Sequence, residues 1–149
     1  MIGVLACPIN GPALSAKGRN VAIAWYTVKD DQGHAYVAFS RDAGRSFSEP
    51  IRLDDKASLG RVDVELLRDG SALASWIEVG DGGSQFRARH IAVDGARSLA
   101  ATIAVVGASR TSPRIASNGN ELIFAWTDNT AGKSQVRTAV AALPGDSRR

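Results

Sequence analysis

The chain has 149 residues, of which 44% are hydrophobic and 22% are charged; these proportions exclude a disordered or fibrous protein and are typical of one globular domain. The formal net charge is +3, but the basic residues are scattered along the sequence, so we expect no nucleic-acid partner. No stretch reaches the roughly 20 consecutive apolar residues of a membrane-spanning helix, and we expect no membrane partner.

The first predicted elements are pairs of strands that recur along the chain. Three segments align on their tryptophans, Trp25, Trp76 and Trp126, which are 51 and 50 residues apart. Each tryptophan follows a short apolar run, AIAW, LASW or IFAW, and a turn pair, KG, DG or NG, lies six or seven residues earlier. A strand, a tight turn and a second strand are therefore predicted in each repeat.

Two further runs extend these hairpins. A third strand is predicted at HAYVAFS from His34, at SQFRARHIAV from Ser84 and at SQVRTAVAAL from Ser134. A fourth strand is predicted at EPIRL (49–53) and at LAATIAVV (99–106), whereas the last repeat lacks one. The apolar positions alternate with a period of two, which favours strands over helices throughout the chain.

The repeats divide the chain into units at about 10–56, 57–107 and 108–149. Four antiparallel strands in about 50 residues are typical of a β-propeller blade. A β-sandwich of short strands is the alternative, but it does not explain the regular tryptophan spacing. The sequence therefore favours an all-β fold of three four-stranded blades, with the repeated tryptophans in the core rather than stacked on a sugar.

The stretch SRDAGRSF (40–47) lies between the third and fourth strands of the first unit. It fits the pattern SxDxGxxF with Ser40, Asp42, Gly44 and Phe47, and AVDGARSL (92–99) is a degenerate copy in the second unit. This pattern resembles the Asp box, or BNR repeat, of the sialidase-like β-propellers. Short polar side chains beside a glycine that can take a positive φ predict a structural turn rather than a catalytic site.

Blade geometry predicts where a ligand would bind. The loops before each first strand, and those between the second and third strands, gather at one mouth of a propeller channel. We expect these loops to carry the candidate ligand-binding residues, which are Arg61, Asp63, Glu78, Arg114, Tyr26 and Asp128. Arginine pairs bidentately with a carboxylate, so the set suits an anionic sugar. The alternative for each residue is an ordinary solvated charge or polar group.

The resemblance implies a glycoside hydrolase of exo-sialidase type, in which arginines hold the sugar carboxylate, a tyrosine paired with a glutamate is the nucleophile and an aspartate is the acid/base. The Arg-Ile-Pro segment that opens such catalytic domains is absent, and neither Tyr26 nor Tyr36 matches the nucleophile by a motif, so no catalytic residue is assigned. We expect a glycan-directed module that binds with weak or no hydrolysis by this chain alone. The alternative is a non-enzymatic propeller scaffold or an interaction module.

The resemblance also implies six blades, twice the number of units in this chain. Three blades leave strand edges and apolar faces open. The run GVLACPI (3–9) precedes the first unit as EPIRL precedes the second, so we expect it to add as an exchanged outer strand to the third unit of a second copy. The expected assembly is a homodimer forming a six-bladed ring. The alternative is a longer propeller of which these residues are the C-terminal half. Family members are often exported; no export signal is evident in the sequence.

Metal-binding residues are few. Cys7 is the only cysteine, which excludes an intrachain disulfide and a cysteine-rich site. His34 and His90 are 56 residues apart and have no ligand-like spacing to carboxylates. We therefore expect no metal and no cofactor.

Overall fold

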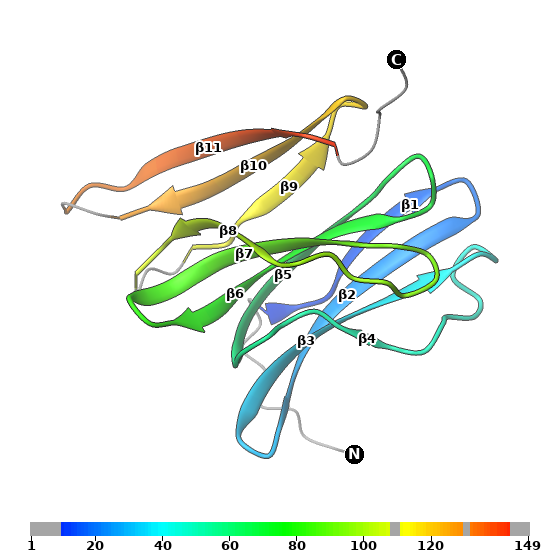
Figure 1. Cartoon of the computed structure of the whole chain (residues 1–149), viewed down its shortest axis with the longest axis horizontal. Coiled ribbons are helices and arrows are strands. Elements are labelled where there is room, and N and C mark those ends of the chain that lie inside the picture. The colour runs from blue at the N-terminus through cyan, green and yellow to red at the C-terminus, as the bar shows by residue number, and fades with distance from the viewer. Residues whose placement is uncertain (1–9, 108–110, 130–131, 144–149) are drawn as a thin grey trace.

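The computed structural model describes residues 10–107, 111–129 and 132–143, and the described chain is all-β, with no α-helix (Figure 1). The expectation of an all-β fold is confirmed. The first sheet contains β1 (Ala13–Lys17), β2 (Asn20–Lys29), β3 (Gln32–Ser40) and β4 (Ile51–Arg52). The second contains β5 (Ser58–Leu66), β6 (Ala72–Gly80), β7 (Gly83–Ile91) and β8 (Ala101–Val105). The third contains β9 (Arg114–Ser117), β10 (Glu121–Asp128) and β11 (Gln135–Ala142).

Each sheet is an antiparallel meander in which every strand pairs with its neighbour in sequence. Within the described residues the third sheet has three strands rather than four, and no strand pairs with the outer edge of β11. The exchanged strand expected at 3–9 lies outside the described residues. The six-bladed ring stays a prediction, because the described residues of one chain form only three sheets.

The second sheet lies between the other two (Figure 1). Its face that bears Ala74 and Trp76 packs on the first sheet, where Ala24 and Val37 belong to the same core cluster. Its opposite face packs on the third sheet and forms a second cluster, built from Leu67, Leu73, Ile77, Phe86, Ala88, Val106, Ile115, Leu122 and Phe124. Successive strand side chains point to opposite faces, so one strand such as β6 supplies both cores.

Polar contacts link the first strands of the three sheets. Ser15 Oγ on β1 accepts a hydrogen bond from the Leu66 N–H on β5 at 2.9 Å. One sheet further on, Asp63 Oδ2 accepts the Ile115 N–H at 2.9 Å. Each bond joins residues that are 51 or 52 positions apart. The repeat length seen in the sequence therefore reappears as the spacing between neighbouring sheets.

The second-to-third-strand hairpin of the first sheet is tighter than the sequence indicates. β2 and β3 pair out to Lys29 and Gln32, and the two turn residues Asp30 and Asp31 have φ values of 51° and 60°. Two consecutive positive φ values are those of a type I′ turn, which suits the right-handed twist of the strands. The expectation that Tyr26 lies in a loop between the second and third strands is therefore wrong, because both strands extend up to this two-residue turn.

The repeated tryptophans differ in burial. Trp76 is fully buried between the first and second sheets, whereas Trp25 and Trp126 are half-buried. Trp126 contacts Phe86 of the second sheet, with ring centroids 5.9 Å apart, and Trp25 stacks on Tyr36 of its own sheet at 5.7 Å. The core position expected for each tryptophan is therefore wrong for Trp25, which lies on the face of the first sheet that no other sheet of the described residues covers.

Candidate functional site

The SRDAGRSF turn is held by its own side chains. Ser40 Oγ accepts the Gly44 N–H at 2.9 Å and donates to Asp42 Oδ1 at 2.8 Å. Asp42 in turn accepts the Ser46 N–H at 2.9 Å and the Ser46 hydroxyl at 2.6 Å. Gly44 has a φ of 82°, a value that glycine adopts without strain. These bonds engage the side chains of Ser40 and Asp42 inside the turn.

The same bonds set the ionisation of Asp42. The hydroxyl and N–H of Ser46, followed by the Ser40 hydroxyl, lower the pKa of Asp42 from 3.8 to about 2. Hydrogen bonds to the charged form favour that form, so the turn is built around an ionised carboxylate. Phe47, the aromatic residue of the SxDxGxxF pattern, is exposed in the single chain.

The six candidate ligand residues lie on strands rather than in loops. Arg61 and Asp63 are on β5, and Arg114 begins β9. Tyr26 is on β2, Glu78 is on β6 and Asp128 ends β10. The loop positions expected from the sequence are wrong, because the strands continue to the very ends of their hairpins. Only the first three candidates come together.

Arg61 has an unusual backbone. The pairing of β5 with β6 shifts register between Ser58 and Asp63, which marks β-bulges, and Arg61 has a φ of 55°. A positive φ is uncommon for a residue with a side chain and is a form of local strain often found at functional sites. The Arg61 N–H donates to Asn10 Oδ1 at 2.9 Å, and its Nη1 donates to Ser112 Oγ at 3.3 Å. The Asn10 amide thus holds the bulge.

Arg61 and Arg114 line one pocket of about 320 Å³ where the first strands of the three sheets begin. We call it the arginine pocket; its lining is Gly11, Pro12, Ala13, Arg61, Val62, Ser112, Pro113 and Arg114. Arg114 is exposed, and its Nη1 is 3.8 Å from Asp63 Oδ1. Arg61 also borders a second hollow of about 330 Å³, between β5 and the segment that contains Gly107 and Thr111. Two guanidinium groups at one opening favour an anion.

Asp63 positions this region and does not line the pocket. It is buried, and its two oxygens accept the N–H groups of Val64 and Ile115 at 3.0 and 2.9 Å. Burial raises the pKa of Asp63, although the two backbone bonds and Arg114 oppose the shift. Its bond to Ile115 ties β9 to β5, and it thereby fixes where Arg114 begins its strand.

Glu78 belongs to a buried cluster between the first and second sheets. Its Oε2 accepts the Trp76 indole N–H and the Asp55 N–H, both at 2.9 Å, and its Oε1 is 3.7 Å from Arg87 Nε. Arg89 Nη2 is 2.6 Å from Asp55 Oδ2, and its guanidinium lies over the Trp76 ring at 5.4 Å. A carboxylate with these partners ties β6 to the connection between β4 and β5. The sequence contains a signal for it, because Glu78 follows Trp76 by two residues and so shares its face.

Tyr26 and Asp128 are also remote from the arginine pocket. A Cβ placed on Gly33 would lie 2.7 Å from the Tyr26 hydroxyl, so the Tyr26 ring packs directly on the backbone of β3. Asp128 Oδ2 accepts from Arg137 Nε at 3.2 Å, across the β10–β11 pair. Neither residue lines the pocket.

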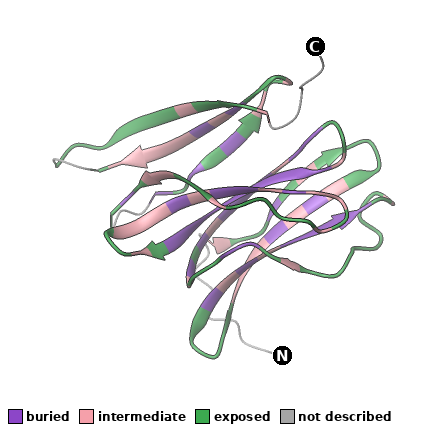
Figure 2. Cartoon of the chain, viewed as in Figure 1, coloured by how far each residue is buried: buried purple, intermediate pink, exposed green. Residues whose placement is uncertain are grey.

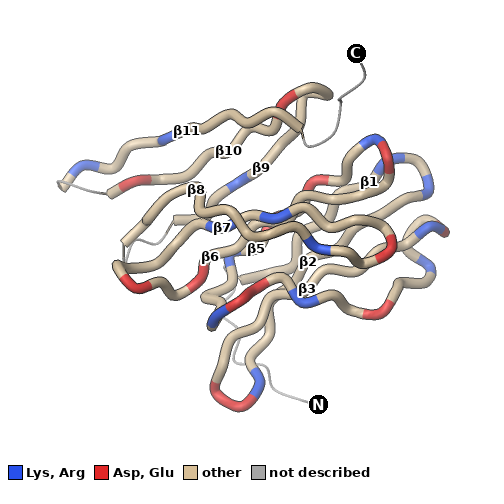
Figure 3. The backbone as a smooth tube through the Cα atoms, in the orientation of Figure 1, with Lys and Arg blue, Asp and Glu red and all other residues tan. Residues whose placement is uncertain are grey.

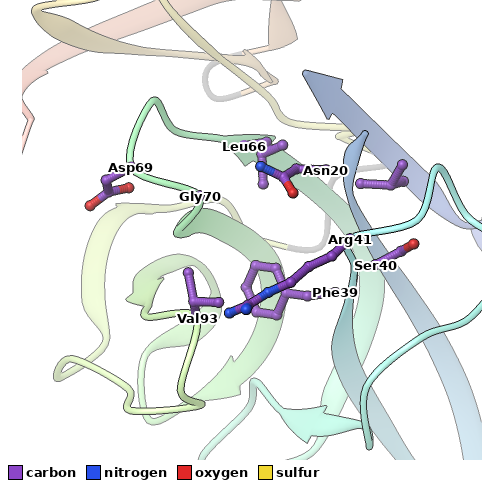
Figure 4. Close-up of a pocket in the computed structure, with 9 residues that line it drawn as sticks. Asn20, Phe39, Ser40, Arg41, Leu66, Asp69, Gly70 and Val93 are labelled. Carbon is purple, nitrogen blue, oxygen red and sulfur yellow. The ribbon is translucent and has the colours of Figure 1, made fainter. Parts of the chain in front are cut away.

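A third pocket, of about 260 Å³, lies at the opposite end of β5 (Figure 4). Phe39, Leu66 and Val93 give it apolar walls, and Asp69 and Arg41 stand at its sides. Figure 4 shows the Arg41 side chain extending past Phe39 toward Val93. This pocket adjoins the SRDAGRSF turn through Ser40 and was not expected from the sequence.

The charged residues of the described chain are interspersed in sign over all three sheets (Figure 3). No group of three His, Cys, Asp or Glu side chains in the described residues is arranged to hold a metal ion. His34 lies on β3 and His90 on β7, where His90 Nε2 is 2.8 Å from Ser71 Oγ. Within the described part of the chain, no helix is long and apolar enough to cross a membrane. No family model matches this chain, and no curated protein matches it significantly.

Proposed function

We propose that this chain is a three-bladed module of the sialidase-like β-propeller type that binds an anionic glycan with weak or no hydrolysis. Two features support the blade interpretation. The three antiparallel sheets pack face to face in sequence order, as neighbouring blades do. The SRDAGRSF turn is closed by Ser40 and Asp42, between the third and fourth strands of the first sheet.

The observation that carries the proposed binding is the pairing of Arg61 with Arg114 at one opening. Each guanidinium offers a planar fork that matches a carboxylate. Arg114 is exposed and available, whereas Arg61 is pre-positioned by a strained backbone that Asn10 holds in place. Sugar carboxylates are the ligand class that this geometry suits, because the residues beside the two arginines are small and Ser112 adds a hydroxyl among them.

The same contacts speak against efficient hydrolysis by the candidate residues. A nucleophilic tyrosine needs a glutamate beside it in the sugar site. Tyr26 packs on Gly33, and Glu78 is buried against Trp76; neither lines the arginine pocket. Glycan binding without turnover is therefore the activity that we propose for the single chain.

The test is a binding titration with free N-acetylneuraminic acid, followed by NMR shift perturbation and calorimetry. Its methyl ester, which lacks the negative charge, is the matched ligand control. Arg114→Gln should weaken binding at least about tenfold, because one charge-assisted hydrogen bond is worth about 1.5 kcal/mol or more. Arg41→Gln changes an arginine at the other pocket and should leave binding unchanged.

Three outcomes contradict this proposal. One is equal binding of the acid and its ester, and another is loss of binding in Arg41→Gln but not in Arg114→Gln. The third is no binding of any acidic sugar, which favours the alternative of a non-enzymatic scaffold. Release of a fluorogenic leaving group from a sialoside, abolished in Arg61→Gln, would instead establish a hydrolase.

A further inference from the structure

Within the described residues, the first and third sheets each present one apolar face that no other sheet covers. On the first sheet we define the leading face as Leu14, Ile23, Trp25 and Tyr36; Leu14 pairs with Ile23, and Trp25 pairs with Tyr36. On the third sheet we define the trailing face as Ile123, Ala125, Val136 and Val140; Ile123 pairs with Val140. Cross-strand partners and alternate residues share a face, so each set is one surface. The second sheet covers the opposite face of each of these two sheets.

The internal repeat shows what each leading-face position looks like when it is covered. Ile23 and Ala74 both stand two residues before a tryptophan, and their partners on the first strands are Leu14 and Val64. Val64 is 3% exposed because the first sheet covers it, whereas its counterpart Leu14 is 64% exposed. The two side chains differ in their neighbours and not in their place in the sheet.

The trailing face gives the same result. Trp76 pairs with Arg87 and Trp126 pairs with Arg137, so Phe86 and Val136 occupy corresponding positions. Phe86 is fully buried under the third sheet, but Val136 is 75% exposed. Figure 2 shows this contrast along whole strands: β11 is mostly exposed, whereas the corresponding strand β7 is buried or intermediate throughout. Exposed apolar surface that recurs at otherwise buried positions marks an interface.

The contacts between the second and third sheets indicate what fits the trailing face. Phe86 meets Phe124 and Trp126 of the next sheet, with ring centroids 6.1 and 5.9 Å apart. The leading-face residues in the corresponding places are Ile23 and Trp25. The chain therefore carries, at its two ends, the two halves of an interface that it already forms twice internally.

We infer that a second copy of this chain covers both faces, so that the trailing face of each copy packs on the leading face of the other. Val136 of one copy then lies against Ile23 and Trp25 of its partner. A head-to-tail contact either closes into a ring or polymerises. Two copies contribute six sheets, within the roughly four to eight blades of propellers, whereas a single copy contributes too few and a third copy would exceed that range.

This inference does not depend on glycan binding, because the arginine pocket and the two end faces share no residue. The first measurement is the native mass of the full chain by light scattering during size-exclusion chromatography. We expect twice the chain mass of 15.6 kDa. A monomer, or a series of growing polymers, overturns the inference.

The interface itself is tested with Val136→Asp. A carboxylate at this exposed position leaves the single chain folded, but it is buried without a partner in the ring, so the native mass should halve. Leu99→Asp is the matched control, because Leu99 is exposed in the β7–β8 loop, away from both faces, and this variant should stay dimeric.

Circular dichroism confirms that both variants keep their strand content. If Val136→Asp is unfolded, the leading-face variant Leu14→Asp provides the same test from the other side of the contact. A Val136→Asp or Leu14→Asp protein that is folded and still dimeric overturns the inference, as does dissociation of Leu99→Asp to the same extent.

Discussion

Glu78→Gln provides a sharp test of how the second sheet is joined to the connection between β4 and β5. Glu78 is buried, and its Oε2 accepts two hydrogen bonds, from the indole of Trp76 and from the backbone of Asp55. Glutamine keeps the shape of the side chain and one oxygen acceptor, but it removes the negative charge beside Arg87. The variant therefore isolates the contribution of the charge from that of the packing.

The magnitude follows from the two bonds. A hydrogen bond to a charged group contributes about 1.5–3 kcal/mol, and one between neutral groups about 0.5–1.5 kcal/mol. Losing the charge that accepts these two bonds should therefore lower the free energy of unfolding by about 2 kcal/mol, or Tm by about 6 °C in a domain of this size. Glu78→Ala leaves both donors and Arg87 without the carboxylate, and it should lower the free energy of unfolding by about 4 kcal/mol.

The assay is urea unfolding followed by tryptophan fluorescence, at one protein concentration because association shifts apparent stability. Asp81→Asn is the control; Asp81 is an exposed acid that pairs with Lys56 at 3.3 Å, and its loss should change stability by less than about 0.5 kcal/mol. A Glu78→Gln protein as stable as the natural one would refute the reasoning, because it would show that the cluster is not held by the charge.

Three further predictions follow from local contacts. The Ser46 hydroxyl is the largest cause of the lowered pKa of Asp42, so Ser46→Ala should move that pKa from about 2 back toward 3.8 in a ¹³C-carboxyl NMR titration; the stability that Asp42 contributes is present above its unfolded pKa and is lost as pH falls toward 2. Asp31→Gly should raise Tm by roughly 1–3 °C, measured by calorimetry, because glycine removes the strain of a φ of 60° at the turn. Burial raises the pKa of Asp63, so ionising this carboxyl destabilises the folded state. Protonation as pH falls from 7 to 4 should therefore stabilise the natural chain relative to Asp63→Asn. The measurement is the difference between their free energies of unfolding in urea titrations, which should increase in favour of the natural chain. The first argument is contradicted if the pKa of Asp42 is unchanged in Ser46→Ala, and the second if Tm is lower in Asp31→Gly. The third is contradicted if the difference in unfolding free energy between the natural chain and Asp63→Asn is constant with pH.

The strands were predictable because the same pattern of residues occurs in each repeat, so that one repeat supports the interpretation of the others. The alternation around Trp76 gives β6 and β7, and the same pattern 50 residues later gives β10 and β11. The turn pairs KG, DG and NG each place a glycine of positive φ between the first two strands of a sheet. Local pattern and long-range repeat agree at these positions, and such agreement specifies a fold.

The site was less predictable, because its residues depend on contacts between sheets. The positive φ of Arg61 arises from a bulge that Asn10 stabilises from 51 residues away, and nothing in the local letters LGRVD indicates it. The burial of Glu78 likewise depends on a loop residue of the preceding unit, Asp55. The lengths of β2 and β3 were underestimated because the turn between them, Asp30-Asp31, lacks the glycine that usually marks a type I′ hairpin.

The two proposals can fail separately, and one variant shows this. The arginine pocket is formed by β1, β5 and β9 of a single chain, so it exists whether or not a ring closes. Val136→Asp should therefore give a monomer that binds N-acetylneuraminic acid with an affinity within about twofold of the dimer, and calorimetry should give one site per chain in both proteins. Loss of binding upon dissociation would show that the partner completes the site, which contradicts a pocket built from one chain. If binding is unchanged in the monomer, the ring does not alter the affinity of a single pocket. It instead holds two arginine pockets at a fixed separation, which raises avidity for a glycan with two acidic ends and not for a monosaccharide.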